Sequence, residues 1–321
     1  MTDNAILVGD VGGTHARFAI VDVSGPGALR IEHRLDLEQT FPTFSGALRT
    51  YIEHCGLSSV PASTVIAVAG PVTAGRARFT NRQWEISEDA LRDFGFSKAL
   101  LINDFVALAF AVEVLSERDL YVIGPALGGL HGAPISILGP GTGFGVSCLA
   151  RDGDRVVPIA TEGGHIGFAP GNETELALLR YLWKKFERVG VERILSGPGL
   201  ENIYQGLAQL GGRDVVTLSA AQITDNAARG EAGCLEALQL FCSIFGAVAG
   251  DIALVHGARG GVYIAGGIAQ KIQVFLAQSE FRARFESKGR LSSFVQSIPT
   301  QLILNADAAL LGAAHSARML G

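Results

Sequence analysis

Two glycine-rich loops, each flanked by apolar stretches of strand character, constrain the fold of this chain most. The loops are Gly9–Thr14 (GDVGGT) and Gly139–Gly145 (GPGTGFG), about 130 positions apart. The predicted strands around them are Ala5–Val8, Ala16–Val21, Ile135–Leu138 and Val146–Leu149. Each β-loop-β unit opens a segment in which further strands and helices alternate. This repetition predicts two related α/β halves with a ligand cleft between them.

Length and composition agree with two domains and exclude several classes of protein. A chain of 321 residues exceeds the size at which one hydrophobic core stops growing. With 48% hydrophobic and 18% charged residues, the chain is not intrinsically disordered. A net charge of −5 argues against nucleic acid and against a membrane surface as partners.

The cysteines and the apolar segments predict a cytoplasmic protein without a membrane span. The four cysteines form no C-x-x-C pair, so we expect reduced thiols and no zinc ribbon. The start, MTDNAILVGD, lacks the basic and apolar regions of a signal peptide. The most apolar stretch, Leu238–Gly257, contains Asp251 and His256, which favours a buried core helix.

Periodicity and end signals predict the remaining elements. Further strands are expected at Leu29–Leu37, Thr64–Ala69, Ala99–Ile102, Gly261–Ile264 and Ile298–Ile303. Helices are expected at Phe44–His54, Ser87–Phe94, Phe105–Leu115, Glu173–Arg188, Glu201–Gln209, Ala220–Asn226, Leu235–Leu254, Arg282–Glu286 and Ala306–Met319. Ser87 is a predicted N-cap, and Asn172 with Glu175 has the spacing of a capping box.

The glycine loops are suited to phosphate, although neither has a standard nucleotide-binding pattern. No loop matches G-x-G-x-x-G before a helix, and no Gly-Lys pair exists for a Walker loop. The remaining way to bind phosphate is a hairpin turn whose backbone N–H groups point at the phosphate oxygens. Thr14 and Thr142 would add hydroxyl donors, and Asp10 could hold Mg²⁺ through water. The alternative is that both loops are plain hairpin turns, in which glycine is routine.

Six sequence blocks in order resemble the bacterial ATP-dependent glucokinases of the zinc-free branch. They are GDVGGTHARFA from Gly9, LLINDFVALA from Leu100, GPGTGFG from Gly139, EGGHIGFAP from Glu162, ERILSGPGL from Glu192 and GGVYIAGGI from Gly260. The resemblance extends along nearly the whole chain to the terminal ALLGAAH segment. Two differences are His15, where the family usually has Asn, and the lack of the cysteine-rich zinc motif of related sugar kinases.

The resemblance implies an α/β, two-domain actin/hexokinase-like (ribonuclease H-like) fold with an interdomain cleft. The small domain would comprise residues 1–112 and 304–321, and the large domain residues 113–303. The implied reaction is transfer of phosphate from ATP, with Mg²⁺, to the 6-hydroxyl of glucose at the entry to glycolysis. The family also suggests a cytoplasmic homodimer.

The same resemblance assigns roles to individual residues. Asp104 would be the catalytic base and a sugar contact. The other sugar contacts would be Asn103, Glu162, His165 and Glu192. The nucleotide would be held by Gly9, Asp10, Gly12, Gly13, Thr14, Gly141, Thr142, Gly143, Gly266 and Gly267, with Asp10 also the Mg²⁺ residue. Thr80 and Asn81 are weaker candidates for lining the sugar site.

Each assignment has a structural alternative. Asp104 follows a buried strand and precedes an apolar helix, so it could be an ordinary N-cap. His165 could be a buried structural histidine, and Glu192 a surface charge beside Arg193. Gly266 and Gly267 could be a turn that starts a helix.

Alternative functions use the same fold. A kinase for fructose, mannose or an N-acetylated amino sugar would differ only in pocket shape. A sugar-sensing regulator, chaperone or filament protein is possible on such a fold, since fold alone does not determine activity. The Asn103-Asp104 pair and the Glu162–His165 block favour a sugar kinase.

Overall fold

The computed structural model describes residues 5–12, 16–22, 30–37, 41–57, 59–79, 84–153 and 155–317. The chain divides into two compact units. The first unit comprises Met1–Arg118 with Asn305–Gly321, and the second comprises Asp119–Leu304. Each has its own hydrophobic core.

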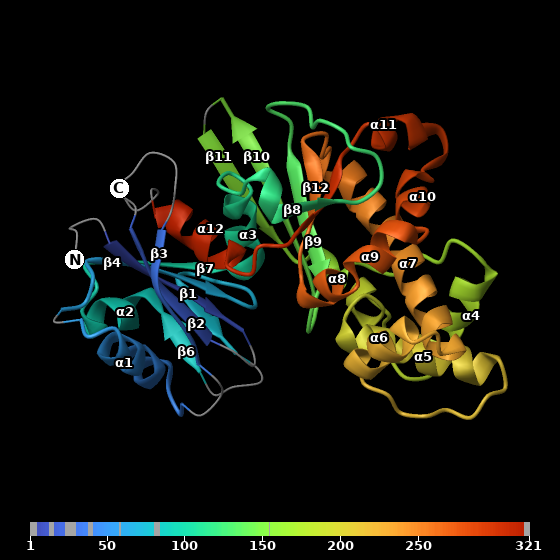
Figure 1. Cartoon of the computed structure of the whole chain (residues 1–321), viewed down its shortest axis with the longest axis horizontal. Coiled ribbons are helices and arrows are strands. Elements are labelled where there is room, and N and C mark those ends of the chain that lie inside the picture. Colours follow the sequence, from blue (N-terminus) through green and yellow to red (C-terminus); the bar gives the residue numbers. More distant parts are fainter. Residues whose placement is uncertain are drawn as a thin grey trace. The chain divides into compact units, whose positions relative to one another are not determined.

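The first unit is built on a mixed sheet with the strand order β3-β2-β1-β4-β7 (Figure 1). These strands are β1 (Ala5–Val11), β2 (Ala16–Asp22), β3 (Arg30–Leu37), β4 (Ser63–Val68) and β7 (Lys98–Asn103). β1, β4 and β7 are mutually parallel, whereas β2 runs antiparallel to both of its neighbours. A small hairpin joins β5 (Arg76–Arg78) to β6 (Glu85–Ser87). The carboxyl ends of three parallel strands therefore meet at one edge, where α/β sheets bind ligands.

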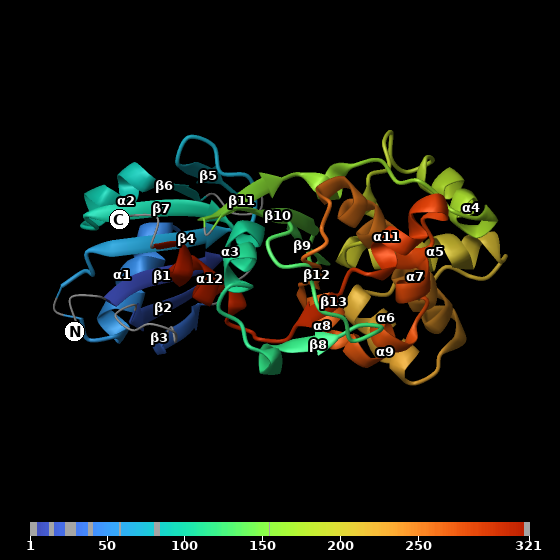
Figure 2. The same ribbon diagram turned by 90° about the horizontal axis from the view of Figure 1, so that it is seen from above.

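Helices cover the first sheet. α1 (Phe44–His54) and α2 (Glu88–Phe94) contribute apolar side chains to the core that contains Phe18 and Ile66. α12 (Ala308–Ser316) packs on β1 and β4 and beside α3 (Asp104–Ala111), as the two views show (Figures 1 and 2). This second contact is close, because a Cβ atom added at Gly312 would lie 1.8 Å from the carbonyl oxygen of Ala107.

The second unit has the strand order β11-β10-β9-β12-β13-β8. The strands are β8 (Leu120–Val122), β9 (Ile135–Pro140), β10 (Phe144–Asp152), β11 (Arg155–Thr161), β12 (Gly261–Ile264) and β13 (Thr300–Ile303). β9, β12 and β13 are parallel, and β9–β10–β11 form an antiparallel meander. Both predicted β-loop-β units are thus hairpins, β1–β2 and β9–β10.

The helices of the second unit include one long helix that packs on several of the others. They are α4 (Glu173–Leu182), α5 (Gly197–Leu210), α6 (Ala220–Ala228), α7 (Ala232–His256), α8 (Gly267–Lys271), α9 (Gln273–Gln278), α10 (Phe281–Glu286) and α11 (Ser292–Gln296). α7 is long and apolar enough to cross a membrane, but 67% of its most apolar window is buried inside the protein. Its side chains Phe241 and Phe245 belong to the core, as expected for a core helix.

The helices α3 and α4 end earlier than predicted, and the predicted capping box of α4 is only half formed. α3 ends at Ala111 and not at Leu115, because three-residue turns replace the helical bonds. α4 ends at Leu182 and not at Arg188. The chain beyond it forms turns in which Lys184 and Lys185 donate to the carbonyls three residues before them, and Val189 then accepts a hydrogen bond from the backbone of Phe168. Asn172 caps α4, but Glu175 bonds to the N–H of Gly171 and not to that of Asn172.

Candidate functional site

Asn103 and Asp104 lie at the carboxyl end of β7, on either side of the start of α3. The N-cap is Asn103, whose Oδ1 accepts hydrogen bonds from the N–H groups of Phe105 and Val106 at 2.9 and 3.3 Å. Its Nδ2 donates to the carbonyl of Gly70, just beyond the neighbouring strand β4, at 3.1 Å. Asn103 therefore joins two adjacent strand ends at the edge of the sheet.

Asp104 is the first residue of α3, so the N-cap alternative for it is wrong. Its Oδ1 accepts a hydrogen bond of 2.9 Å from the N–H of Phe105, and the residue is half-buried. Burial, together with the nearby negative charge of Asp10, raises the pKa of the Asp104 carboxyl to about 7. A carboxylate with a pKa near the working pH is well suited to general base catalysis.

Gly9 and Asp10 lie within β1 and not in the loop after it. Packing requires glycine at position 9, because an added Cβ would lie 2.8 Å from the Ile66 side chain. Asp10 forms an ion pair with Arg17, its register partner on β2. Arg17 also donates to the carbonyl of Ala306 at 2.6 Å. Of the remaining first-loop residues, Gly12 is described, whereas Gly13, Thr14 and His15 lie outside the described residues, as do Thr80 and Asn81.

The second glycine loop is the tight hairpin turn between β9 and β10, here named the 141–143 turn. It comprises Gly141, Thr142 and Gly143, and the N–H of Gly141 donates to the carbonyl of Gly143 at 2.8 Å. The turn is partly exposed, with Thr142 open to solvent. It follows a parallel strand, so it lies at the ligand-binding edge of the second sheet.

Gly266 and Gly267 lie beside this turn, because β12 is the parallel neighbour of β9. Gly266 has a φ of +97°, and an added Cβ would lie 2.3 Å from the carbonyl oxygen of Pro140. A Cβ added at Gly139 would lie even closer, 1.8 Å from the carbonyl oxygen of Ala265. Gly266 is also the N-cap of α8 and Gly267 its first residue, so the helix-start alternative is correct for their local role. Glycine at these positions lets two strand ends approach backbone to backbone.

The predicted sugar contacts of the second unit form one connected group. Glu162 precedes a short 3₁₀ turn (Gly163–His165) and His165 ends it, with 3.8 Å between His165 Nε2 and Glu162 Oε2. Their side chains are 63% and 60% exposed, so His165 is not a buried structural histidine. Glu192 lies in a second 3₁₀ turn (Val191–Arg193), and the bond from Val191 N–H to the carbonyl of Ile166 joins the two turns.

Glu192 is half-buried and not a surface charge. Its Oε2 accepts a hydrogen bond of 3.0 Å from the N–H of Phe144, the residue that follows the 141–143 turn. Sequence reasoning missed this link, and it also missed Arg17 and the capping role of Ser196. Ser196 could have been found from its sequence, because a serine before Gly-Pro-Gly has the pattern of an N-cap with proline in the first turn.

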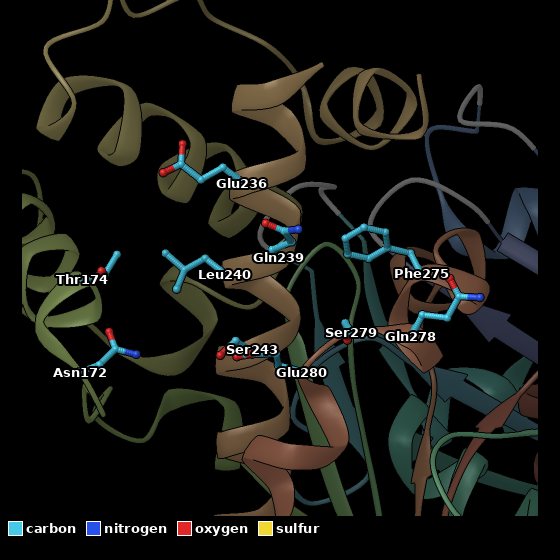
Figure 3. A pocket seen from close by; sticks show the side chains of 10 residues that line it. All are labelled: Asn172, Thr174, Glu236, Gln239, Leu240, Ser243, Phe275, Gln278, Ser279 and Glu280. Atoms are coloured by element: carbon cyan, nitrogen blue, oxygen red, sulfur yellow. The ribbon is translucent and has the colours of Figure 1, made fainter. Parts of the chain in front are cut away.

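A pocket among the described residues lies elsewhere in the second unit. It has a volume of about 630 Å³ and lies among α4, α7 and α9. Leu240 of α7 points toward Thr174 of α4, and Gln239 of α7 lies on the side of Phe275 of α9 (Figure 3). None of the predicted site residues lines it. The predicted site therefore rests on strand ends and turns and not on this pocket.

Comparison with known proteins identifies close relatives. The sequence profile of the glucokinase family matches residues 7–320. A glucokinase from Caulobacter sp. (strain K31) is 48% identical over 96% of this chain and 93% of its own length. The glucokinase from Chromobacterium violaceum is 44% identical over 97% of this chain and 89% of its own. A crystal structure of glucokinase from an Antarctic psychrotroph is 35% identical, with a TM-score of 0.88 over 98% of this chain and 99% of that one. The predicted two-domain, actin-like α/β fold is confirmed by these similarities.

Proposed function

The chain belongs to the glucokinase family and phosphorylates glucose with ATP, and we propose that Asp104 is the base of this reaction. Asp104 would accept the proton of the glucose 6-hydroxyl as that oxygen attacks the γ-phosphorus of ATP. The observation that carries the proposal is that capping α3 and supplying a carboxylate fall to two different residues at the start of this helix. Asn103 supplies the cap, and a half-buried carboxylate with a raised pKa remains beside it at the edge of the sheet.

The other residues would position the substrates, since phosphoryl transfer depends mainly on alignment and charge neutralisation. We assign Asn103, Glu162, His165 and Glu192 to the sugar hydroxyls, because amide and carboxylate oxygens and a neutral imidazole nitrogen accept hydrogen bonds from hydroxyls. In the second unit, Gly141, Thr142 and Gly143 would contact the phosphates with backbone N–H groups, and Gly266 with Gly267 would lie against the adenosine.

The first hairpin would also bind the phosphates, through Gly9, Asp10, Gly12, Gly13 and Thr14. Asp10 fits Mg²⁺, because this ion is commonly held by one carboxylate through water together with the phosphates of the substrate. Its carboxylate lies at a strand end and is kept in place by Arg17. When bound, Mg²⁺ would neutralise charge on the phosphates. Asp10→Asn should raise the Mg²⁺ concentration needed for half-maximal activity.

The test of the base is Asp104→Asn in a coupled assay for glucose 6-phosphate with glucose, ATP and Mg²⁺. We expect kcat to fall by about 10²–10⁴-fold, because the amide does not accept the proton. The melting temperature should not fall, since Asn103 keeps the cap of α3 and the amide carries no charge to bury. If Asp104→Asn retained most of its turnover, Asp104 would not be the base.

The alternative substrates and a non-catalytic role are tested in the same assay. Fructose, mannose and N-acetylglucosamine at fixed ATP should give lower kcat/KM than glucose. A regulator without kinase activity would bind sugar and form no sugar phosphate.

We further propose a cytoplasmic homodimer without nucleic acid or membrane partners, which the family resemblance and the net charge of −5 support. Light scattering after gel filtration would measure the mass.

A further inference from the structure

Glu192 is the residue that connects the group of sugar contacts to the 141–143 turn. Its Oε2 accepts the N–H of Phe144 at 3.0 Å, and a Cβ added at Gly143 would lie 2.3 Å from the same oxygen. The carboxylate therefore packs directly on the glycine of the turn. Among the described residues, the protein hydrogen bond of this carboxylate is made by Oε2, so Oε1 is available for a sugar hydroxyl.

The backbone around Glu192 is attached at both ends. On one side, the N–H of Val191 bonds to Ile166 at 2.9 Å, next to the turn that carries Glu162 and His165. On the other side, the hydroxyl of Ser196 donates to the carbonyl of Glu192 at 2.7 Å. The N–H of Gly197 then donates to the carbonyl of Gly141 at 2.9 Å. The segment 190–197 thus holds the 141–143 turn at two points, one of them through Glu192.

We propose that Glu192 is a positioning residue for the 141–143 turn and that, through this contact, bound glucose increases the affinity for the nucleotide. A sugar hydroxyl on Oε1 would restrain the carboxylate in the orientation that holds the N–H of Phe144, and the turn would already be ordered when the phosphates arrive. The proposal rests on the proposed function, because it takes Glu192 as a sugar contact. Thermodynamic linkage then requires that the nucleotide tighten glucose binding by the same factor.

The test measures one ratio by isothermal titration calorimetry. It is the Kd of AMPPNP, a non-hydrolysable ATP analogue, without glucose divided by its Kd at saturating glucose, both with Mg²⁺. In the unmodified protein we expect a ratio of about 5 or more. Glu192→Ala should reduce the ratio to below about a third of that value, since a hydrogen bond to a charged group is lost. Glu192→Gln should keep most of the ratio, because its amide oxygen still accepts the N–H of Phe144.

A matched pair of glycine-to-alanine substitutions in the 141–143 turn tests the same contact without changing Glu192. Gly143→Ala inserts a methyl group where the carboxylate lies, so the ratio should fall as in Glu192→Ala. Gly141→Ala adds its methyl group in open space, so the ratio should stay at its original value whatever the absolute Kd. Circular dichroism checks that each variant is folded. If Gly143→Ala does not fold, the Ala and Gln variants of Glu192 decide the question.

The outcomes distinguish the proposed coupling of glucose to the nucleotide from the proposed role of Glu192 as a sugar contact. If Glu192→Ala raises the glucose Kd but leaves the AMPPNP ratio unchanged, the coupling is wrong and the sugar contact stands. If the glucose Kd itself is unchanged, Glu192 is not a sugar contact, and that part of the proposed function fails. A ratio of 1 in the unmodified protein would overturn the coupling directly.

Discussion

Asn103 and Asp104 are neighbours with side chains of nearly the same shape, yet they have different roles because α3 begins between them. The backbone of Asn103 is extended, which lets its side chain cap the helix. Asp104 is already helical, so its carboxylate is not needed for the cap. Its half-buried position and the charge of Asp10 then penalise ionisation and raise its pKa. A one-residue difference in helix start decides which of the two can act as a base.

The raised pKa of Asp104 predicts the pH dependence of the enzyme. With a pKa of about 7, log kcat/KM should rise with a slope of one below pH 7 and level off above it. A rate profile from pH 5 to 9 measures this. A level profile down to pH 5 would contradict the role of Asp104 as base.

The same group should make stability depend on pH. The folded-state pKa lies above the ordinary value of 3.8 for an aspartate, so the folded state binds the proton more tightly. Its contribution to stability is complete below pH 4 and is lost as the pH rises to 7. Asp104→Asn should lack this loss, which urea titrations at pH 4 to 7 would measure as a smaller decline than in the unmodified protein.

At the scale of elements, the start of α5 is held by a buried serine. Ser196 is 2% exposed, accepts the N–H of Gly199 at 3.0 Å and donates to the carbonyl of Glu192. It caps the helix that packs against the 141–143 turn and shapes the segment that carries Glu192. By contrast, Ser219 caps α6 in an exposed capping box with Gln222. The two caps use the same chemistry in different surroundings.

We expect Ser196→Ala to destabilise the protein by about 1–2 kcal/mol, because a buried cap and a second hydrogen bond are lost. Ser219→Ala is the matched control and should cost about 0.5–1 kcal/mol. Urea denaturation measures both. If the two variants lost equal stability, the bond between Ser196 and Glu192 would contribute nothing.

At the scale of the whole molecule, the chain builds two hydrophobic cores and returns to the first. The core of the first unit contains Phe18 and Trp84, and that of the second contains Phe241 and Phe245. The C-terminal segment belongs to the first unit, where α12 packs on β1, β4 and α3. The first unit therefore depends on a segment that begins 187 positions after Arg118, since it resumes at Asn305.

Gly312→Ala should weaken the first unit, because its methyl group would meet the backbone of α3 at Ala107. We expect a loss of about 1–3 kcal/mol from overpacking. Trp183 is 56% exposed and lies in the second unit, so Trp183→Phe leaves Trp84 as the fluorescent probe of the first. In the Trp183→Phe background, Gly312→Ala should lower the urea midpoint of the first unit. Gly128→Ala should leave it unchanged, because its methyl group would be in open space.

The sequence by itself determined the α/β class, the two glycine hairpins and most helix starts. These features depend on neighbours in the chain. The alternation of apolar residues, the position of glycine and the Ser87 cap are all readable within a few residues. The same local signals failed at the ends of α3 and α4, where no glycine or proline marks the last helical residue.

Only the tertiary structure decided the surroundings of the site residues. The ion pair of Asp10 with Arg17 requires the strand pairing of β1 and β2. The contact of Glu192 with the N–H of Phe144 joins residues 48 positions apart. Burial and charge at Asp104 likewise come from strands that pack side by side. Local pattern places a residue on an element, whereas its partners and its pKa depend on which elements the fold brings together.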